Sequence, residues 1–425
     1  MFELASNDRA IASFTMFGHS LVHWFETSIP IFLVVWLTEF PETSVVVFGF
    51  VVALGYAPFG LGALPAGVLT DRYGPKRLIL FCLGGMSLAF VLLALANSVA
   101  AITVALVLWG VAASVYHPAG LALISTGVDE RGTVFAYHGI AGNLGIALGP
   151  FVTATLLMAG FEWHLVAAAL AIPGFAGMAY GLTADFDPAA AVDADSVADA
   201  SDPLSLSELL ENSRTLFASA FAVVFVIVTF EGLFYRGVLT YLPEILHDLP
   251  AMAALDLSAA LEGIEPADYI YVGLLVVGIA GQYVGGKFTD RIPAERGLAV
   301  IFAVLAVLAL AFVPVSSMGL GAIVALCAVL GFFLFAIQPF YQEAVAVHTP
   351  ADTRGLSYGY TYLGEFGFGA ASIALGGLAL GVDRTLFFAM LFGFAIVGMG
   401  LSLGLAVGMT RFDAWRSATG TRSGD

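Results

Sequence analysis

The sequence predicts an all-α membrane protein: twelve transmembrane helices arranged as two pseudo-symmetric six-helix bundles. Three observations predict this fold: an extreme apolar composition, twelve long apolar segments, and a repeat between the two halves. Of the 425 residues, 60% are apolar and only 11% are charged, against about 25% charged residues in a typical soluble domain. Since polar residues must cover a soluble globule, the composition excludes a soluble enzyme, a nucleic-acid-binding protein and a disordered protein.

Twelve segments are long enough to cross a bilayer, which takes about 20 apolar residues. In the first half we expect them near residues 11–37, 45–69, 77–97, 101–126, 134–159 and 163–183. In the second half we expect them near residues 215–242, 267–288, 297–314, 320–347, 355–380 and 385–409.

One polar interruption divides the chain into six plus six segments. Residues 184–213 are rich in Ala, Asp and Ser, as in a flexible linker, and their end (203–212) could form a short surface helix. We therefore expect an N-terminal bundle (1–183), an acidic cytoplasmic linker (184–213) and a C-terminal bundle (214–425).

The basic residues predict the orientation. All 15 Lys and Arg residues except Arg236 and Arg384 fall on one side of the membrane if both termini lie together. By the positive-inside rule we expect both termini in the cytoplasm of a multi-pass protein of the cell membrane. The net charge of −17 argues against nucleic acid as a partner.

The two halves repeat three features at nearly constant offsets. Asp71-Arg72 recurs as Asp290-Arg291, His117-Pro118 as Gln338-Pro339, and Arg131-Gly132 as Arg354-Gly355, at offsets of 219, 221 and 223 residues. Internal repeats are a feature of transporters, whose substrate sites lie near mid-membrane between the halves.

The segment after the second predicted span carries a resemblance to a known family. Its pattern of glycine, aspartate, arginine, glycine and basic residues resembles motif A of the major facilitator superfamily. The pattern comprises Gly67, Asp71, Arg72, Gly74, Lys76 and Arg77. The resemblance implies twelve helices in two halves, secondary transport by alternating access, and a cytoplasmic gate at this motif. Asp71 could pair there with Arg131 or with the turn at Arg354, while Asp290 and Arg291 form the second copy.

Span five resembles motif C, which the superfamily associates with antiporters. Gly142, Gly145 and Gly149 share a helix face with His138 before Pro150, and small residues also allow tight helix packing. Together with His117-Pro118 and Arg131-Gly132, this span is similar to fosmidomycin-resistance-like exporters.

Ionisable residues inside spans are costly and usually face an aqueous cavity. His19, His23 and Glu26 occupy one face of span one at i, i+4 and i+7, and span seven adds Glu231. These four residues are our candidates for proton coupling. Further polar residues on spans four, five, seven, ten and eleven are expected to line the substrate cavity: His117, His138, Asn143, Tyr235, Arg236, Gln338, Tyr341, Gln342, Tyr358, Tyr362 and Glu365.

Arg236 leaves two interpretations open at this point. It could hold an anionic group of the substrate, or it could pair with Glu231 or Glu26 and neutralise a buried charge.

Neither a metal nor a cofactor is expected from the sequence. His19 and His23 are one turn apart and could ligate a metal, but intramembrane metalloenzymes usually need several such pairs and the chain has seven histidines. No Walker pattern is present, so ATP is not expected as the energy source.

The sequence thus predicts a secondary active transporter and no enzyme. We favour proton-coupled export of a small organic molecule by a monomer, with a proton rather than sodium as the coupling ion. Proton- or sodium-coupled uptake of an organic anion is the alternative, and substrate identity is not readable from the sequence.

Overall fold

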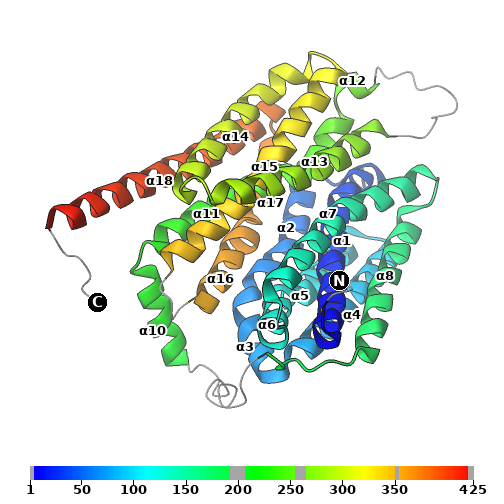
Figure 1. Cartoon of the computed structure of the whole chain (residues 1–425). Coiled ribbons are helices and arrows are strands. Elements are labelled where there is room, and N and C mark those ends of the chain that lie inside the picture. The colour runs from blue at the N-terminus through cyan, green and yellow to red at the C-terminus, as the bar shows by residue number, and fades with distance from the viewer. Residues whose placement is uncertain (1–3, 192–205, 254–264, 350–353, 420–425) are drawn as a thin grey trace.

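The computed structural model describes residues 4–191, 206–253, 265–349 and 354–419, and nearly all of them belong to helices (Figure 1). The first half consists of α1 (Ser6–Glu39), α2 (Val45–Leu61), α3 (Ala63–Tyr73), α4 (Pro75–Ala94), α5 (Val99–Ala113), α6 (Tyr116–Gly127), α7 (Arg131–Met158) and α8 (Trp163–Thr183). The second half consists of α11 (Phe221–His247), α13 (Pro266–Thr289), α14 (Ala294–Ser316), α15 (Leu320–His348), α16 (Arg354–Tyr362), the π-helix η3 (Leu363–Phe368), α17 (Ala371–Leu380) and α18 (Arg384–Thr419).

Within the described ranges, eleven helices are long and apolar enough to cross a membrane, and the bent pair α2–α3 makes a twelfth. A helix satisfies its backbone hydrogen bonds internally. This is required in a bilayer, whose interior has no water to bind free N–H and C=O groups. The predicted all-helical membrane fold is therefore confirmed. Between the halves lies α10 (Leu206–Phe217), close to where the sequence predicts a surface helix, and α12 (Pro250–Ala253) follows α11.

Three of the crossings are irregular in the middle. The crossing formed by α2 and α3 bends by 47°. That formed by α5 and α6 breaks at Ser114–Val115, because Pro118 has no N–H and its ring collides with the carbonyl group four residues earlier. The crossing formed by α16 and α17 passes through η3, and such π-turns are frequent at functional sites.

These three irregular points lie side by side. A Cβ at Gly62, between α2 and α3, would overlap the Ser114 side chain, and a Cβ at Gly60 would overlap the backbone of Gly367 in η3. Only glycine lets backbones approach this closely.

The two halves meet most tightly on one side of the molecule. We call the side where α1 begins and α18 ends the terminal face, and the opposite side the far face (Figure 1). Near the far face, Gly49 of α2 lies against Tyr241 of α11 and Gly377 of α17. There too, Tyr269 of α13 reaches Thr155 and Met158 of α7.

Candidate functional site: a polar cavity between the two halves

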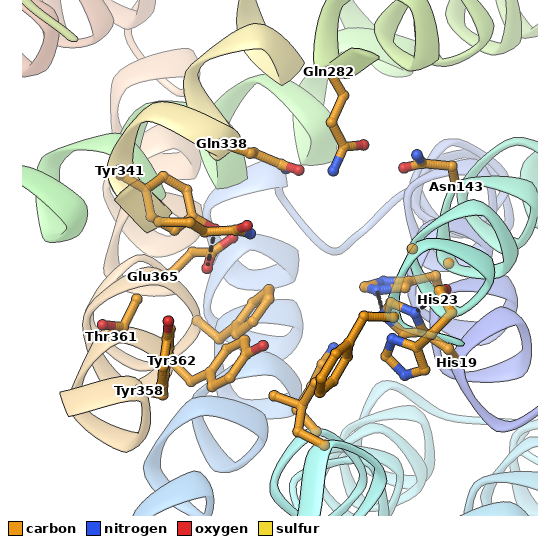
Figure 2. A pocket seen from close by; sticks show the side chains of 18 of the residues that line it. His19, His23, Asn143, Gln282, Gln338, Tyr341, Tyr358, Thr361, Tyr362 and Glu365 are labelled. Carbon is orange, nitrogen blue, oxygen red and sulfur yellow. Dashed lines mark hydrogen bonds between the residues drawn. The ribbon is translucent and has the colours of Figure 1, made fainter. Parts of the chain in front are cut away.

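A cavity of about 600 Å³ lies between the halves and extends from mid-depth toward the terminal face. Its walls come from α1, α6 and α7 on one side and from α11, α13, α15, α16 and η3 on the other. The cavity includes all but one of the residues we expected to line it: His117, His138, Asn143, Tyr235, Gln338, Tyr341, Gln342, Tyr358, Tyr362 and Glu365. His19 and His23 also line it, and Figure 2 shows them opposite Tyr362 and Glu365.

The wall from the first half is rich in histidine. The rings of His19 and His138 stack with centroids 3.9 Å apart, and the ring of His117 lies 5.3 Å from His19 and 5.6 Å from His23. His117 belongs to α6, which begins directly after the break at Ser114–Val115. Tyr116, its neighbour, hydrogen-bonds to the ring of His138 and to the carbonyl group of Thr15.

Arg236 is the expected cavity residue that the structure places elsewhere. Its side chain is 2% exposed and forms an ion pair with Glu26 of α1 behind the cavity wall. The guanidinium group also lies over the rings of Phe366, Tyr56 and Tyr235 at 4.6, 5.0 and 5.5 Å. Of the two interpretations of Arg236, the structure shows the buried pair. Nearby charges make buried arginine acceptable in a membrane protein.

Glu26 connects this pair to the histidines. Its second carboxylate oxygen lies 2.5 Å from Nδ1 of His23, and its backbone carbonyl group accepts a hydrogen bond of 2.6 Å from Tyr56. His19, His23 and Glu26 thus form one chain of contacts along the face that the i, i+4, i+7 spacing predicts.

Glu231 is not part of the chain of contacts formed by His19, His23 and Glu26. It is 2% exposed, and neither of its carboxyl oxygens has a hydrogen-bond partner in the described residues. The charged groups that act on it are Glu365 and Arg236. A buried carboxylate without a donor is costly, whereas a neutral carboxyl group is tolerated more readily.

Glu365 lies in the π-helix η3 and faces the cavity (Figure 2). Its carboxylate accepts a hydrogen bond of 2.8 Å from the hydroxyl group of Tyr341 on α15. The second half therefore places one carboxyl group at the cavity wall and a second one, Glu231, close behind it.

Amide side chains complete the cavity at the end nearer the far face. Asn143, Gln282 and Gln338 point toward one another there in Figure 2, and the buried side-chain oxygen of Gln282 has no partner in the described part of the chain. Gln282 is not among the residues expected from the sequence to line the cavity. A lone amide inside an apolar span was the signal available.

The predicted gate residues lie near the terminal face and are not locked together here. In the described residues Asp71 forms no ion pair, and Arg131 donates instead to the carbonyl groups of Val128 and Ala191. Lys76 donates to the carbonyl group of Ala184 at 2.5 Å. Arg72, Gly74 and Arg77 lie where α3 ends and α4 begins, and Gly67 lies within α3. Asp290 and Arg291 directly follow α13. Arg354 begins α16, and its side chain lies outside the described residues.

The glycines of span five face α1. A Cβ at Gly142 would overlap the ring of His19, one at Gly145 the carbonyl oxygen of Ser20, and one at Gly149 the carbonyl oxygen of Trp24. The sequence pattern predicts this close packing, and Pro150 follows within the same helix.

The family model of the Major Facilitator Superfamily matches residues 15–372, most of the chain. The chain belongs to the major facilitator superfamily. As a member, it is a multi-pass membrane protein and a secondary transporter rather than an enzyme. Transporters of this superfamily bind small substrates and often couple to protons.

One relative belongs to the same superfamily. An uncharacterized transporter of the superfamily, YqjV of Bacillus subtilis, is 31% identical over 138 residues. The match covers 32% of this chain and 33% of that protein. The resemblance to fosmidomycin-resistance-like exporters stays a prediction.

Solved structures show the same fold at low sequence identity. The nucleoside transporter NupG superposes with a TM-score of 0.71 at 15% identity, covering 94% of this chain and 99% of that one. The D-xylose-proton symporter gives 0.69 at 15% identity, covering 94% and 97%. A bacterial homolog of the human lysosomal transporter Spinster gives 0.69 at 14% identity, covering 95% and 97%.

Proposed function

We propose that this protein exports a small organic molecule across the cell membrane in exchange for protons, by alternating access of the cavity between its halves. The terminal face is then cytoplasmic, as the distribution of Lys and Arg predicts. The cavity extends toward that face while the halves meet near the far face, so the structure corresponds to an inward-facing state.

The observation that carries proton coupling is the unpartnered carboxyl group of Glu231. It lies beside the cavity wall, close to Glu365, Arg236, Tyr235 and Tyr341. A carboxyl group that is buried in one state and hydrated in the other binds a proton in the first and releases it in the second.

The support for export comes from span five, whose glycines pack against α1 in the pattern that resembles an antiporter motif. The alternative, uptake of an organic anion, rested on a free Arg236. That guanidinium group is paired with Glu26 and lies outside the cavity wall, so the alternative loses the observation that favoured it.

The first test measures protons released on ligand binding. Purified protein in weakly buffered detergent solution is titrated with a panel of antibiotics, nucleosides and sugars, and the pH is followed. We expect at least one compound to release protons from the wild type and none from Glu231→Gln. Glu343→Gln is the matched control, because Glu343 is exposed on α15 and should leave the release intact. Binding that releases no protons and depends on sodium would overturn proton coupling.

The direction of coupling needs a second measurement with the compound identified in the panel. In proteoliposomes, an interior more acidic than the outside drives accumulation by antiport, and an interior more alkaline than the outside drives accumulation by symport. We expect accumulation only with the acidic interior. Accumulation only with the alkaline interior would replace export by uptake.

A further inference from the structure

Three histidines of the cavity wall come together as a set of metal ligands would. His19 and His23 lie one turn apart on α1, and His117 joins them from α6. One ring nitrogen from each lies within 4.8 Å of the other two. The three rings line the cavity rather than the lipid-facing surface.

The proton on the ring of His19 can be placed from its partner. Nδ1 of His19 lies 2.7 Å from the backbone carbonyl oxygen of His138. A carbonyl oxygen only accepts hydrogen bonds, so Nδ1 carries the hydrogen and donates it. In the neutral ring, Nε2 of His19 therefore bears a lone pair.

The same reasoning places the proton of His23. Its Nδ1 lies 2.5 Å from Glu26, whose other carboxylate oxygen pairs with Arg236. A carboxylate held by a guanidinium group is ionised and accepts, so Nδ1 of His23 donates. Nε2 of the neutral ring again bears a lone pair.

These two lone pairs face one another. The Nε2 atoms of His19 and His23 are 3.1 Å apart, and with both rings neutral no hydrogen lies between them. Two electron pairs at this distance repel unless a cation lies close to both. A separation of 3.1 Å also suits two nitrogens that bind one ion at about 2.0–2.1 Å each.

We propose that His19, His23 and His117 bind a divalent transition-metal ion of the zinc type (Zn²⁺, Co²⁺ or Ni²⁺) at the cavity wall. Imidazole nitrogens suit these ions and do not suit Mg²⁺ or Ca²⁺. Three protein ligands leave a fourth position open, and here that position faces the cavity, where a donor atom of a small molecule can occupy it.

The surroundings match those of known metal-binding histidines. A histidine that binds a metal usually donates its other ring N–H to a carboxylate or a backbone carbonyl group. Glu26 does this for His23, and the carbonyl group of His138 does it for His19. His117 makes no hydrogen bond within the described residues, which leaves both of its ring nitrogens available.

A single proton shared by His19 and His23 is the competing explanation. It would satisfy the facing nitrogens equally well but would give His117 no role. The dependence on His117 therefore separates a metal ion from a proton.

The test uses Co²⁺ as a spectroscopic probe of the purified full chain, with any polyhistidine tag removed. Four-coordinate Co²⁺ bound by nitrogen absorbs visible light far more strongly than octahedral Co²⁺ on surface carboxylates. We expect intense bands that saturate at one Co²⁺ per protein and are lost on adding excess Zn²⁺. The thiols of Cys82 and Cys327 are buried.

Variants decide between the outcomes. His117→Gln should weaken Co²⁺ binding more than tenfold. His164→Gln should bind Co²⁺ like the wild type, because the ring of His164 hydrogen-bonds to the carbonyl group of Ala96. His117→Cys should restore binding and add a thiolate band in the near ultraviolet, which shows that the variant folds. Weak octahedral spectra alone, or intense bands that His117→Gln retains, would overturn the proposal.

Discussion

The guanidinium group of Arg236 on α11 pairs with the carboxylate of Glu26 on α1, and these two side chains belong to opposite halves of the chain. The pair is buried, and Glu26 also holds His23. The contact therefore joins the second half to the histidine wall of the first.

Breaking this pair should destabilise the protein strongly. We expect Arg236→Gln to lower the free energy of unfolding by about 3–5 kcal/mol, because it leaves the Glu26 carboxylate buried without its counter-charge. Thermal unfolding in detergent measures the change. The double variant with Glu26→Gln should lose much less than the sum of the single variants, and strictly additive losses would show that the pair is not coupled.

The close contact of α7 with α1 predicts a difference between two glycines of one helix. Gly145→Ala should destabilise by about 1–3 kcal/mol, because the added methyl group overlaps the carbonyl oxygen of Ser20. Gly139→Ala is the matched control: its Cβ meets nothing within 4 Å, and alanine favours the helix over glycine. Equal melting temperatures of the two variants would contradict the packing described here.

The hydrogen bond between Tyr341 and Glu365 should contribute measurably to stability. Tyr341→Phe removes the donor and leaves Glu365 in a buried position without it, at a cost of about 1–3 kcal/mol. Tyr358→Phe removes a hydroxyl group from a more exposed tyrosine, 38% exposed, and should change the melting temperature little. A loss in Tyr341→Phe no larger than that in the control would argue that Glu365 finds another donor.

The proposed orientation predicts which side of the membrane reaches the cavity. Ser125 lines the cavity toward the terminal face, and both natural cysteines are buried. We expect a membrane-impermeant maleimide to label Ser125→Cys only in inside-out vesicles. Glu42→Cys, in the far-face loop between α1 and α2, should react only in right-side-out cells. The opposite pattern would reverse the orientation.

The spacing along one helix allowed much of the site to be predicted. His19, His23 and Glu26 were assigned to one face by the helix period, and the twelve crossings by the apolar runs between polar turns. Both inferences need only local information, since a helix fixes the relative directions of residues three and four apart.

Relationships between helices were not predictable in the same way. The partner of Arg236 depends on how deeply α11 and α1 sit against one another, and the sequence left both Glu231 and Glu26 open as partners. The approach of His117 to His19 depends on the break caused by Pro118. The contacts of Tyr56 and the inward position of Gln282 come from packing between helices. The apolar periodicity of a single helix does not determine that packing.

The mid-depth layer where Gly62 lies against Ser114 and Gly60 lies against Gly367 has a mechanical consequence. Three crossings interrupt their regular backbone hydrogen bonding at the same level, while the segments on either side of that level are α-helices. Such a layer is a seam about which the helix segments toward the terminal face can tilt while those toward the far face stay in place. Bending at this seam requires few backbone bonds to break, because the helices already lack a full set there.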